Sequence, residues 1–192
     1  AGHPSRMRCS ENMKKTVSAL PRARGICTRS LFAEFGIEPL PVYREPAGSP
    51  EGDLKMAQDF PLIRIATIRF VPFYRSEYRQ VPSDIQAQPG PATDIPPERA
   101  RAPGMQQGDW TWIETKGGKI KRRAHRTDRV HPAVARARYG WRFLGKPAPE
   151  PSLHGVWESN VNALSPVDAE CCNPEAGGWP HTGLLCGAYR AD

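Results

Sequence analysis

The chain has 192 residues, which suits one domain of ordinary size or one domain with an extension. Its 21 prolines and 17 glycines favour short strands and many turns over long helices. A net charge of +7 favours an anionic partner and leaves nucleic acid, anionic lipid and a phosphate-rich cofactor open. No apolar run approaches the ~20 residues of a membrane span, and no signal-peptide pattern is present.

The cysteines favour reduced thiols over a disulfide framework, because they are odd in number and irregularly spaced. They are Cys9, Cys27, Cys171, Cys172 and Cys186. Together with the missing signal peptide, they favour a cytoplasmic location. His181 lies between the cysteine pair and Cys186, but the spacing lacks the paired knuckles of a structural zinc site. No iron–sulfur spacing occurs either, so we expect no metal ligand in this chain.

The first half of the chain predicts few regular elements. Residues 1–27 are basic and lack periodicity, and we expect a poorly ordered segment or the edge of an upstream domain there. Residues 28–36 predict a short helix that begins after Thr28 and ends at Gly36. Residues 62–70 alternate and are rich in isoleucine, which predicts a strand. Residues 96–104 predict a helix of one or two turns.

The second half is dominated by strands. Residues 109–115 and 120–127 predict a hairpin around the turn sequence KGGK, and residues 131–141 predict a further strand. Residues 182–191 predict a closing strand with Leu184, Leu185 and Cys186 in the core. Short strands with frequent turns indicate a small barrel or sandwich with minor helices. We expect this domain to span residues 28–192.

The hairpin suggests a nucleic-acid-binding function, because seven of the eleven residues in KGGKIKRRAHR are Lys, Arg or His. Trp110 and Trp112 lie close by and are able to stack on bases. Against this reading, a run of charges is usually a solvated face, and the two tryptophans have at least as good a case for the core. A nucleophilic enzyme is disfavoured because no Gly-x-Ser-x-Gly elbow occurs.

Polar clusters follow the predicted strands and indicate a binding wall for a large polyanionic ligand. Such a wall needs hydroxyl and amide side chains, backbone N–H groups freed by glycine, and a few arginines. The candidate residues lie at four connections: Thr67 and Arg69; Arg75, Ser76, Tyr78, Arg79 and Gln80; Asn160 and Asn162; and residues 177–182, with Trp179 and His181.

An ordered set of motifs resembles a known family. The segments are PLIRIATIRF, YRSEYRQVPS, GDWTWIETKGGKIKRRAHRTDRVHP, EPSLHGVWESNVNALSP and NPEAGGWPHTGLLC. Together they resemble the C-terminal molybdopterin-dinucleotide-binding domain of the dimethyl-sulfoxide-reductase superfamily, in the acetylene-hydratase-like and formate-dehydrogenase or thiosulfate-reductase-like branch. The resemblance runs from about Lys14 to Arg190.

The resemblance implies a mainly β fold, a six-stranded double-psi β-barrel with short helices. It implies a bis-molybdopterin guanine dinucleotide cofactor carrying molybdenum or tungsten, contacted by Thr67, Arg69, Arg75, Ser76, Tyr78, Gln80, Asn160, Asn162, Trp179 and His181. In the family, the metal ligand and any iron–sulfur motif belong to upstream catalytic domains, and an iron–sulfur electron-transfer subunit is a further implied partner. We therefore expect this chain to supply cofactor contacts in an oxidoreductase without carrying the catalytic groups itself.

The chain also departs from the family pattern. Thr-Gly-Arg at the first strand end becomes Thr67-Ile68-Arg69, and the histidine of HSEYRQ becomes Arg75. These changes predict a fragment or a diverged copy. The alternative function is a small basic nucleic-acid-binding barrel, which the resemblance disfavours.

Overall fold

The computed structural model describes residues 33–38, 40, 42–67, 81–101, 104–143, 145–174 and 177–191. Residues 1–44 and 45–192 are two separate units. In the first unit, a helical turn at residues 33–34 ends at Gly36, whose φ is +70° and whose N–H donates to the Ala33 carbonyl. The predicted stop at Gly36 is therefore confirmed. The predicted start at Thr28 lies outside the described residues.

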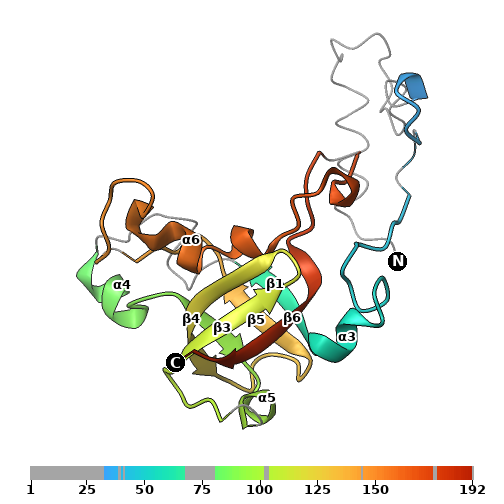
Figure 1. The fold of residues 1–192 in the computed structure, drawn as a ribbon. Helices are drawn as coiled ribbons and strands as arrows, with labels where there is room; N and C mark the ends of the chain where they lie inside the picture. Colours follow the sequence, from blue (N-terminus) through green and yellow to red (C-terminus); the bar gives the residue numbers. More distant parts are fainter. Residues whose placement is uncertain are drawn as a thin grey trace, which may run out of the picture. The chain divides into compact units, whose positions relative to one another are not determined.

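Six strands of the second unit close into a barrel in the order β1-β5-β2-β4-β3-β6 (Figure 1). They are β1 (Leu62–Thr67), β2 (Ala92–Ile95), β3 (Trp110–Thr115), β4 (Gly118–Arg126), β5 (Val134–Arg138) and β6 (Thr182–Arg190). β1 is parallel to β5 and β2 is parallel to β4, while the other neighbouring pairs are antiparallel. If β1 is exchanged with β4, β2 with β5 and β3 with β6, every strand pair and its direction stay the same, so the two halves of the barrel are equivalent. This confirms the expected six-stranded double-psi barrel.

The helical elements are short; α3 precedes β1, and the others lie in the connections between strands. They are α3 (Met56–Asp59), α4 (Pro82–Ala87), α5 (Pro97–Arg101) and α6 (Val156–Ser159), with the 3-10 turns η1 (Leu153–Gly155), η2 (Val161–Leu164) and η3 (Ala169–Cys171). α5 confirms the predicted short helix and begins at Pro97, whose fixed φ suits a first helical position. No helix within the described residues is long and apolar enough to cross a lipid bilayer.

Each predicted strand is present, although β5 covers only Val134–Arg138 of the expected 131–141, and one strand was missed. β2 has four residues, Ala92–Ile95, and lies between Pro91 and Pro96. It is too short to show a period of two, and its pairing with β4 and β5 holds it in place. The hairpin turn is also tighter than expected, because Thr115 pairs directly with Gly118.

Alternate residues of β1, β3, β4 and β5 build the barrel interior, while β2 and β6 bury consecutive residues. In β3, Thr111 and Ile113 are fully buried, whereas Trp110 and Trp112 lie on the opposite, outer face and are only partly buried. The core position considered for the two tryptophans is therefore wrong. The predicted core of β6 is confirmed, since Leu184, Leu185 and Cys186 are buried.

Two arginines occupy the interior in place of apolar side chains. Arg64 of β1 and Arg122 of β4 are both 0% exposed. Arg64 pairs with Ala135 of β5, and Ala124 and Ala137 are also fully buried, so small neighbours leave room for the long side chains. β1 and β4 occupy equivalent places in the barrel: β1 is parallel to β5 and antiparallel to β6, and β4 is parallel to β2 and antiparallel to β3, which are the strands three positions away from β5 and β6.

Candidate functional site

Strand polarity gathers distant segments at one end of the barrel. β1 and β5 are parallel and end together, with Thr67 paired to Arg138, and β6 begins beside the end of β1. β2 begins beside the end of β5, and β4 begins at the hairpin turn after β3. We call this the upper end of the barrel. The connection from β4 to β5, which contains His131, lies at the opposite end.

Residues 159–165 lie over the upper end and are called the capping segment. Within it, Val161 and Leu164 are buried in the core cluster. Asn160 caps the 3-10 turn η2, because its Oδ1 accepts a hydrogen bond from the N–H of Asn162 at 3.0 Å. The side chain of Asn162 is exposed. Asn160 therefore has a structural use for its oxygen, and Asn162 is free to present its amide to solvent or a ligand.

The segment before β6 places the other two described candidates beside the capping segment. His181 is exposed, and its Nδ1 lies 2.8 Å from the Oγ of buried Ser165. The Nε1–H of Trp179 donates to the Asp168 carbonyl at 2.9 Å. Trp179 as a residue remains 39% exposed, so a face of its ring is available for stacking.

The structure thus brings together the chain segments of five candidates at the upper end: Thr67, Asn160, Asn162, Trp179 and His181. The side chain of Thr67 shares the outer face of the barrel with that of Arg138, its partner in register. The remaining candidates, Arg69, Arg75, Ser76, Tyr78 and Gln80, lie outside the described residues.

A buried carboxylate organises the outer barrel face below Thr67. Asp94 is fully buried and lies 2.7 Å from His125 Nδ1, 2.7 Å from Arg136 Nε and 3.3 Å from Arg138 Nη2. Burial alone would raise the pKa of Asp94, but the charge of Arg138 and the contacts with His125 and Arg136 outweigh it and lower that pKa. The carboxylate is therefore ionised, and it ties β2, β4 and β5 together.

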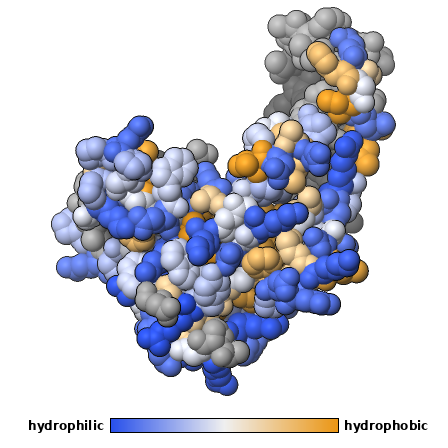
Figure 2. Space-filling model, viewed as in Figure 1, coloured by the Kyte–Doolittle hydropathy of each residue, from blue (hydrophilic) through white to orange (hydrophobic). Residues whose placement is uncertain are grey.

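The basic hairpin is an ordered outer face. Lys119 Nζ lies 4.9 Å from the centroid of the Trp112 ring, and the guanidinium of Arg123 lies 3.9 Å from that of Trp110. Arg122, in the middle of the basic run, points into the barrel. The hairpin cations are thus partly engaged with the tryptophans. Figure 2 shows this side of the molecule as mainly hydrophilic, with smaller hydrophobic areas between charged side chains.

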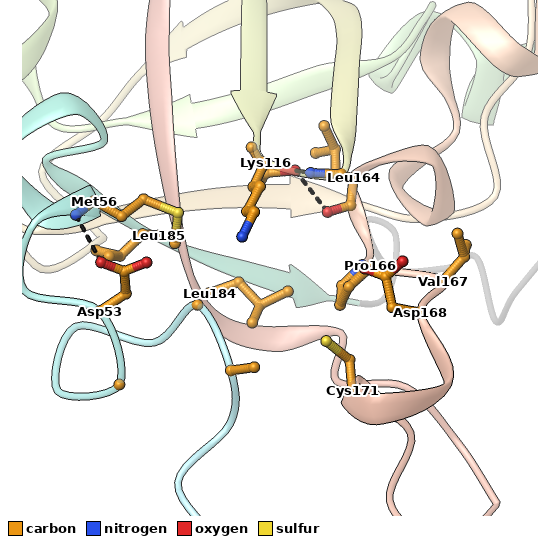
Figure 3. Close-up of a pocket in the computed structure, with 15 residues that line it drawn as sticks. Asp53, Met56, Lys116, Leu164, Pro166, Val167, Asp168, Cys171, Leu184 and Leu185 are labelled. Atoms are coloured by element: carbon orange, nitrogen blue, oxygen red, sulfur yellow. Dashed lines mark hydrogen bonds between the residues drawn. The ribbon is translucent and has the colours of Figure 1, made fainter.

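A pocket of about 360 Å³ lies beside the capping segment, between α3, the hairpin turn, η3 and the start of β6. Its walls are mainly apolar and include Met56, Leu164 and Leu184. Figure 3 shows Lys116 directed into the space between Met56 and Leu164. None of the five described candidates lines this pocket, although Asp168, which accepts the Trp179 hydrogen bond, does.

The cysteines of the described residues do not form a metal site. Cys171 and Cys172 are half-buried and follow each other at the end of η3, whereas Cys186 is buried in β6. In the described part of the chain, no group of three or more His, Cys, Asp or Glu side chains is placed to hold a metal ion. Burial raises the pKa of the Cys186 thiol to about 12.

We expect the cysteine pair to be dispensable for folding. The double substitution Cys171→Ala and Cys172→Ala should change the free energy of unfolding by less than about 1 kcal/mol, because both side chains are partly solvated. Alkylation of the native chain at pH 8, followed by peptide mass spectrometry, should modify both cysteines before Cys186, whose thiolate is rare at that pH. Equal labelling of Cys186 in the folded chain would contradict this placement.

Sequence reasoning missed Arg64, Arg122, Ser165 and Asp94. The sequence held a signal for the two arginines, because each lies two residues from a buried apolar residue of its own alternating strand. Arg64 follows Leu62 in β1, and Arg122 precedes Ala124 in β4. No local signal pointed to Ser165, since its contacts come from Arg64 and from His181 on a different segment.

The chain matches known proteins over most of its length. Residues 63–180 match the family model described as "Molydopterin dinucleotide binding domain". Acetylene hydratase of Syntrophotalea acetylenica is 29% identical over 90% of this chain and 24% of its own length. Dopamine dehydroxylase of Eggerthella lenta is 33% identical over 72% of this chain and 13% of its own length.

A solved structure shares the fold. Acetylene hydratase from Pelobacter acetylenicus superimposes with a TM-score of 0.79 at 26% identity, covering 92% of this chain and 25% of that protein. The chain therefore spans about a quarter of the acetylene hydratases it matches. These comparisons give no support to a nucleic-acid-binding barrel.

Proposed function

The chain belongs to the family of molydopterin dinucleotide binding domains, and we propose that its upper barrel end contacts a pterin guanine dinucleotide carrying molybdenum or tungsten. The observation that supports this site is the convergence of the β1 end, the capping segment and residues 179–181. These segments are far apart in the sequence, and the exposed donors among them are amide and imidazole groups. The domain would provide binding and orientation within a larger oxidoreductase.

The side chains present fit such a ligand. Pterin and guanine edges need hydrogen-bond donors and acceptors, their rings stack on aromatic groups, and the diphosphate needs positive charge. Asn162 offers an exposed amide, His181 has its Nε2 free of the Ser165 contact, and the Trp179 ring is partly exposed. The net charge of +7 favours a polyanion. We propose that Asn162 and His181 hydrogen-bond to the dinucleotide and that Trp179 covers one of its rings.

The bound cofactor would supply the metal centre at which the substrate reacts, and the residues of this chain would hold and orient it. We propose that sister domains, preceding this one in the parent enzyme as in the family, complete the site and bind a second pterin dinucleotide. An iron–sulfur subunit is a further partner of this proposal. The small share of each relative that the chain spans, 24% and 13%, supports a role as one part of a large enzyme.

The proposal is tested by substituting His181 and measuring ligand binding. Guanosine diphosphate serves as a probe for half of the dinucleotide, and calorimetry gives its Kd for the 192-residue chain. His181→Ala should weaken binding by about ten- to a hundredfold, because a hydrogen bond to a charged group is worth roughly 1.5–3 kcal/mol. Retention of the whole cofactor, released from another molybdenum enzyme, is followed by metal analysis after gel filtration.

His131→Ala is the matched control, because His131 is also exposed but lies at the opposite end of the barrel. It should leave the Kd unchanged. If the chain binds neither the probe nor the whole cofactor, the proposed site is wrong. Equal weakening by both substitutions would also contradict it, since the effect would then not depend on the upper end.

A further inference from the structure

Two buried cations lie inside the barrel without a carboxylate partner. Arg64 and Arg122 are 0% exposed, and neither takes part in an ion pair among the described residues. Among the described residues, neither Nε has a hydrogen-bond partner. Burial lowers the pKa of both guanidinium groups, that of Arg122 to about 9. Such groups are costly for stability, and apolar residues of similar size often replace them without loss.

The hydrogen bonds of both arginines point to one structure, the capping segment. Arg122 Nη2 donates to the Ser159 carbonyl at 2.7 Å. Arg64 Nη1 donates to the Val161 carbonyl at 3.0 Å, and its Nη2 donates to Ser165 Oγ at 3.3 Å. The two side chains therefore hold the two ends of residues 159–165 from inside the barrel. Their remaining hydrogen bond among the described residues runs from Arg122 Nη1 to the Ala92 carbonyl, at 3.0 Å.

The contact with Ser165 extends to His181. Ser165 Oγ accepts from Arg64, and Ser165 is 5% exposed, so its hydroxyl proton needs a buried acceptor. His181 Nδ1 lies 2.8 Å from this hydroxyl and is placed to accept its proton. This direction makes neutral His181 the tautomer with its proton on Nε2, so that the free side of the ring is a hydrogen-bond donor.

We propose that Arg64 is a positioning residue that fixes the capping segment and, through Ser165, presents His181 as an Nε2–H donor, while Arg122 holds the other end of the same segment. The use of this arrangement for a cofactor rests on the proposed function. The positioning itself is a property of the ligand-free chain. The two buried arginines lower the folding stability of the chain, and in return they fix the positions of the capping segment and His181. Apolar side chains at the same positions would not do this.

Hydrogen exchange of the ligand-free, full 192-residue chain tests the positioning. The amides of Ala163 and Ser165 donate to carbonyls within the segment, and that of Asn162 donates to Asn160 Oδ1. Arg64→Met should reduce protection of these three amides by about tenfold or more, while the amides of β3 and β4 keep theirs. Arg64→Lys, which keeps the charge but offers one donor nitrogen in place of Nη1 and Nη2, should give an intermediate loss. Arg129→Met, at an exposed site in the β4–β5 connection, should change nothing.

The tautomer gives a second readout that a purely structural role would not move. Nitrogen-15 chemical shifts of the His181 ring at pH 8 should show Nε2–H in the wild-type chain. Both Ser165→Ala and Arg64→Met should shift the ring towards a mixture of tautomers. Ser165→Ala is a small change, so it remains informative if Arg64→Met does not fold.

The inference is overturned if Ser165→Ala leaves both the tautomer and the protection of Asn162, Ala163 and Ser165 at wild-type values. It is also overturned if Arg64→Met reduces protection equally throughout the barrel, because Arg64 would then serve global stability alone. Guanosine diphosphate titration of the same variants separates this result from the proposed function. A wild-type chain that holds the capping segment but does not bind the probe supports the positioning and contradicts the cofactor site.

Discussion

Asp94→Asn should lower the free energy of unfolding by about 3 kcal/mol, because it removes the negative charge shared by three cationic or ionisable side chains. Asp94 is 0% exposed, and its oxygens meet His125, Arg136 and Arg138. These partners are themselves partly exposed, which keeps the cost below that of a fully buried set. Urea unfolding followed by circular dichroism gives the difference at neutral pH.

The pH dependence identifies the charge as the cause. The pKa of Asp94 is lower in the folded chain than the usual value of about 3.9. Its ionised form therefore contributes stability above that value, and the contribution is lost as the pH falls through the lower folded-state pKa. The gap in unfolding free energy between wild-type and Asp94→Asn chains should therefore be present at neutral pH and should close as the pH falls below the ordinary Asp value of about 3.9.

Asp128→Asn is the control for this prediction, because Asp128 is exposed and forms no ion pair among the described residues. It should change the free energy of unfolding by no more than about 0.5 kcal/mol. An Asp94→Asn chain as stable as this control at neutral pH would show that the cluster does not hold β2, β4 and β5 together.

Gly118→Ala should cost about 2–4 kcal/mol and displace the capping segment. A Cβ on Gly118 would lie 2.6 Å from the Ala163 carbonyl oxygen, and φ at this position is +156°. The clash is with backbone, and Thr115 Oγ1, which donates to the Leu164 carbonyl at 2.7 Å, resists separation of the turn from the segment. Urea unfolding measures the loss of stability. The affinity for guanosine diphosphate should also fall, since Asn162 belongs to the displaced segment.

Gly145→Ala is the matched control, because a Cβ there would meet no atom within 4 Å. It should leave stability within about 0.5 kcal/mol of wild type. If the stability of Gly118→Ala also stays within that range, the hairpin turn does not pack closely against the capping segment, and the prediction is wrong.

The strands that sequence reasoning predicted are those whose pattern is local. β1, β3 and β6 alternate or run apolar over six to nine residues, and their phase follows from that pattern alone. β2 could not be found in this way, because four residues show no period and its two polar members, Thr93 and Asp94, resemble a turn. Its strand conformation is imposed by β4 and β5 on either side.

The candidate site was also predictable only in part, as far as its segments could be recognised from local sequence patterns. Its segments were found from strand ends and from the family resemblance, and strand polarity brings those that the structure describes to one end of the barrel. The connection from Arg64 through Ser165 to His181 was beyond local reasoning, because Arg64 and Ser165 are 101 positions apart. Only the closed barrel places an inward-facing side chain of the first strand under a segment that follows the fifth.

The strand order has a consequence for how the chain acquires its structure. β1 pairs only with β5 and β6, β2 with β4 and β5, and β3 with β4 and β6, so no two of the first three strands are neighbours. During synthesis, β1, β2 and β3 therefore emerge before any strand with which they can pair. β1 acquires its second neighbour only when β6 has been made. Contacts of such long sequence separation slow folding and prolong the exposure of strand edges. Premature termination before β6 would leave the β1 and β3 edges open to association with other chains.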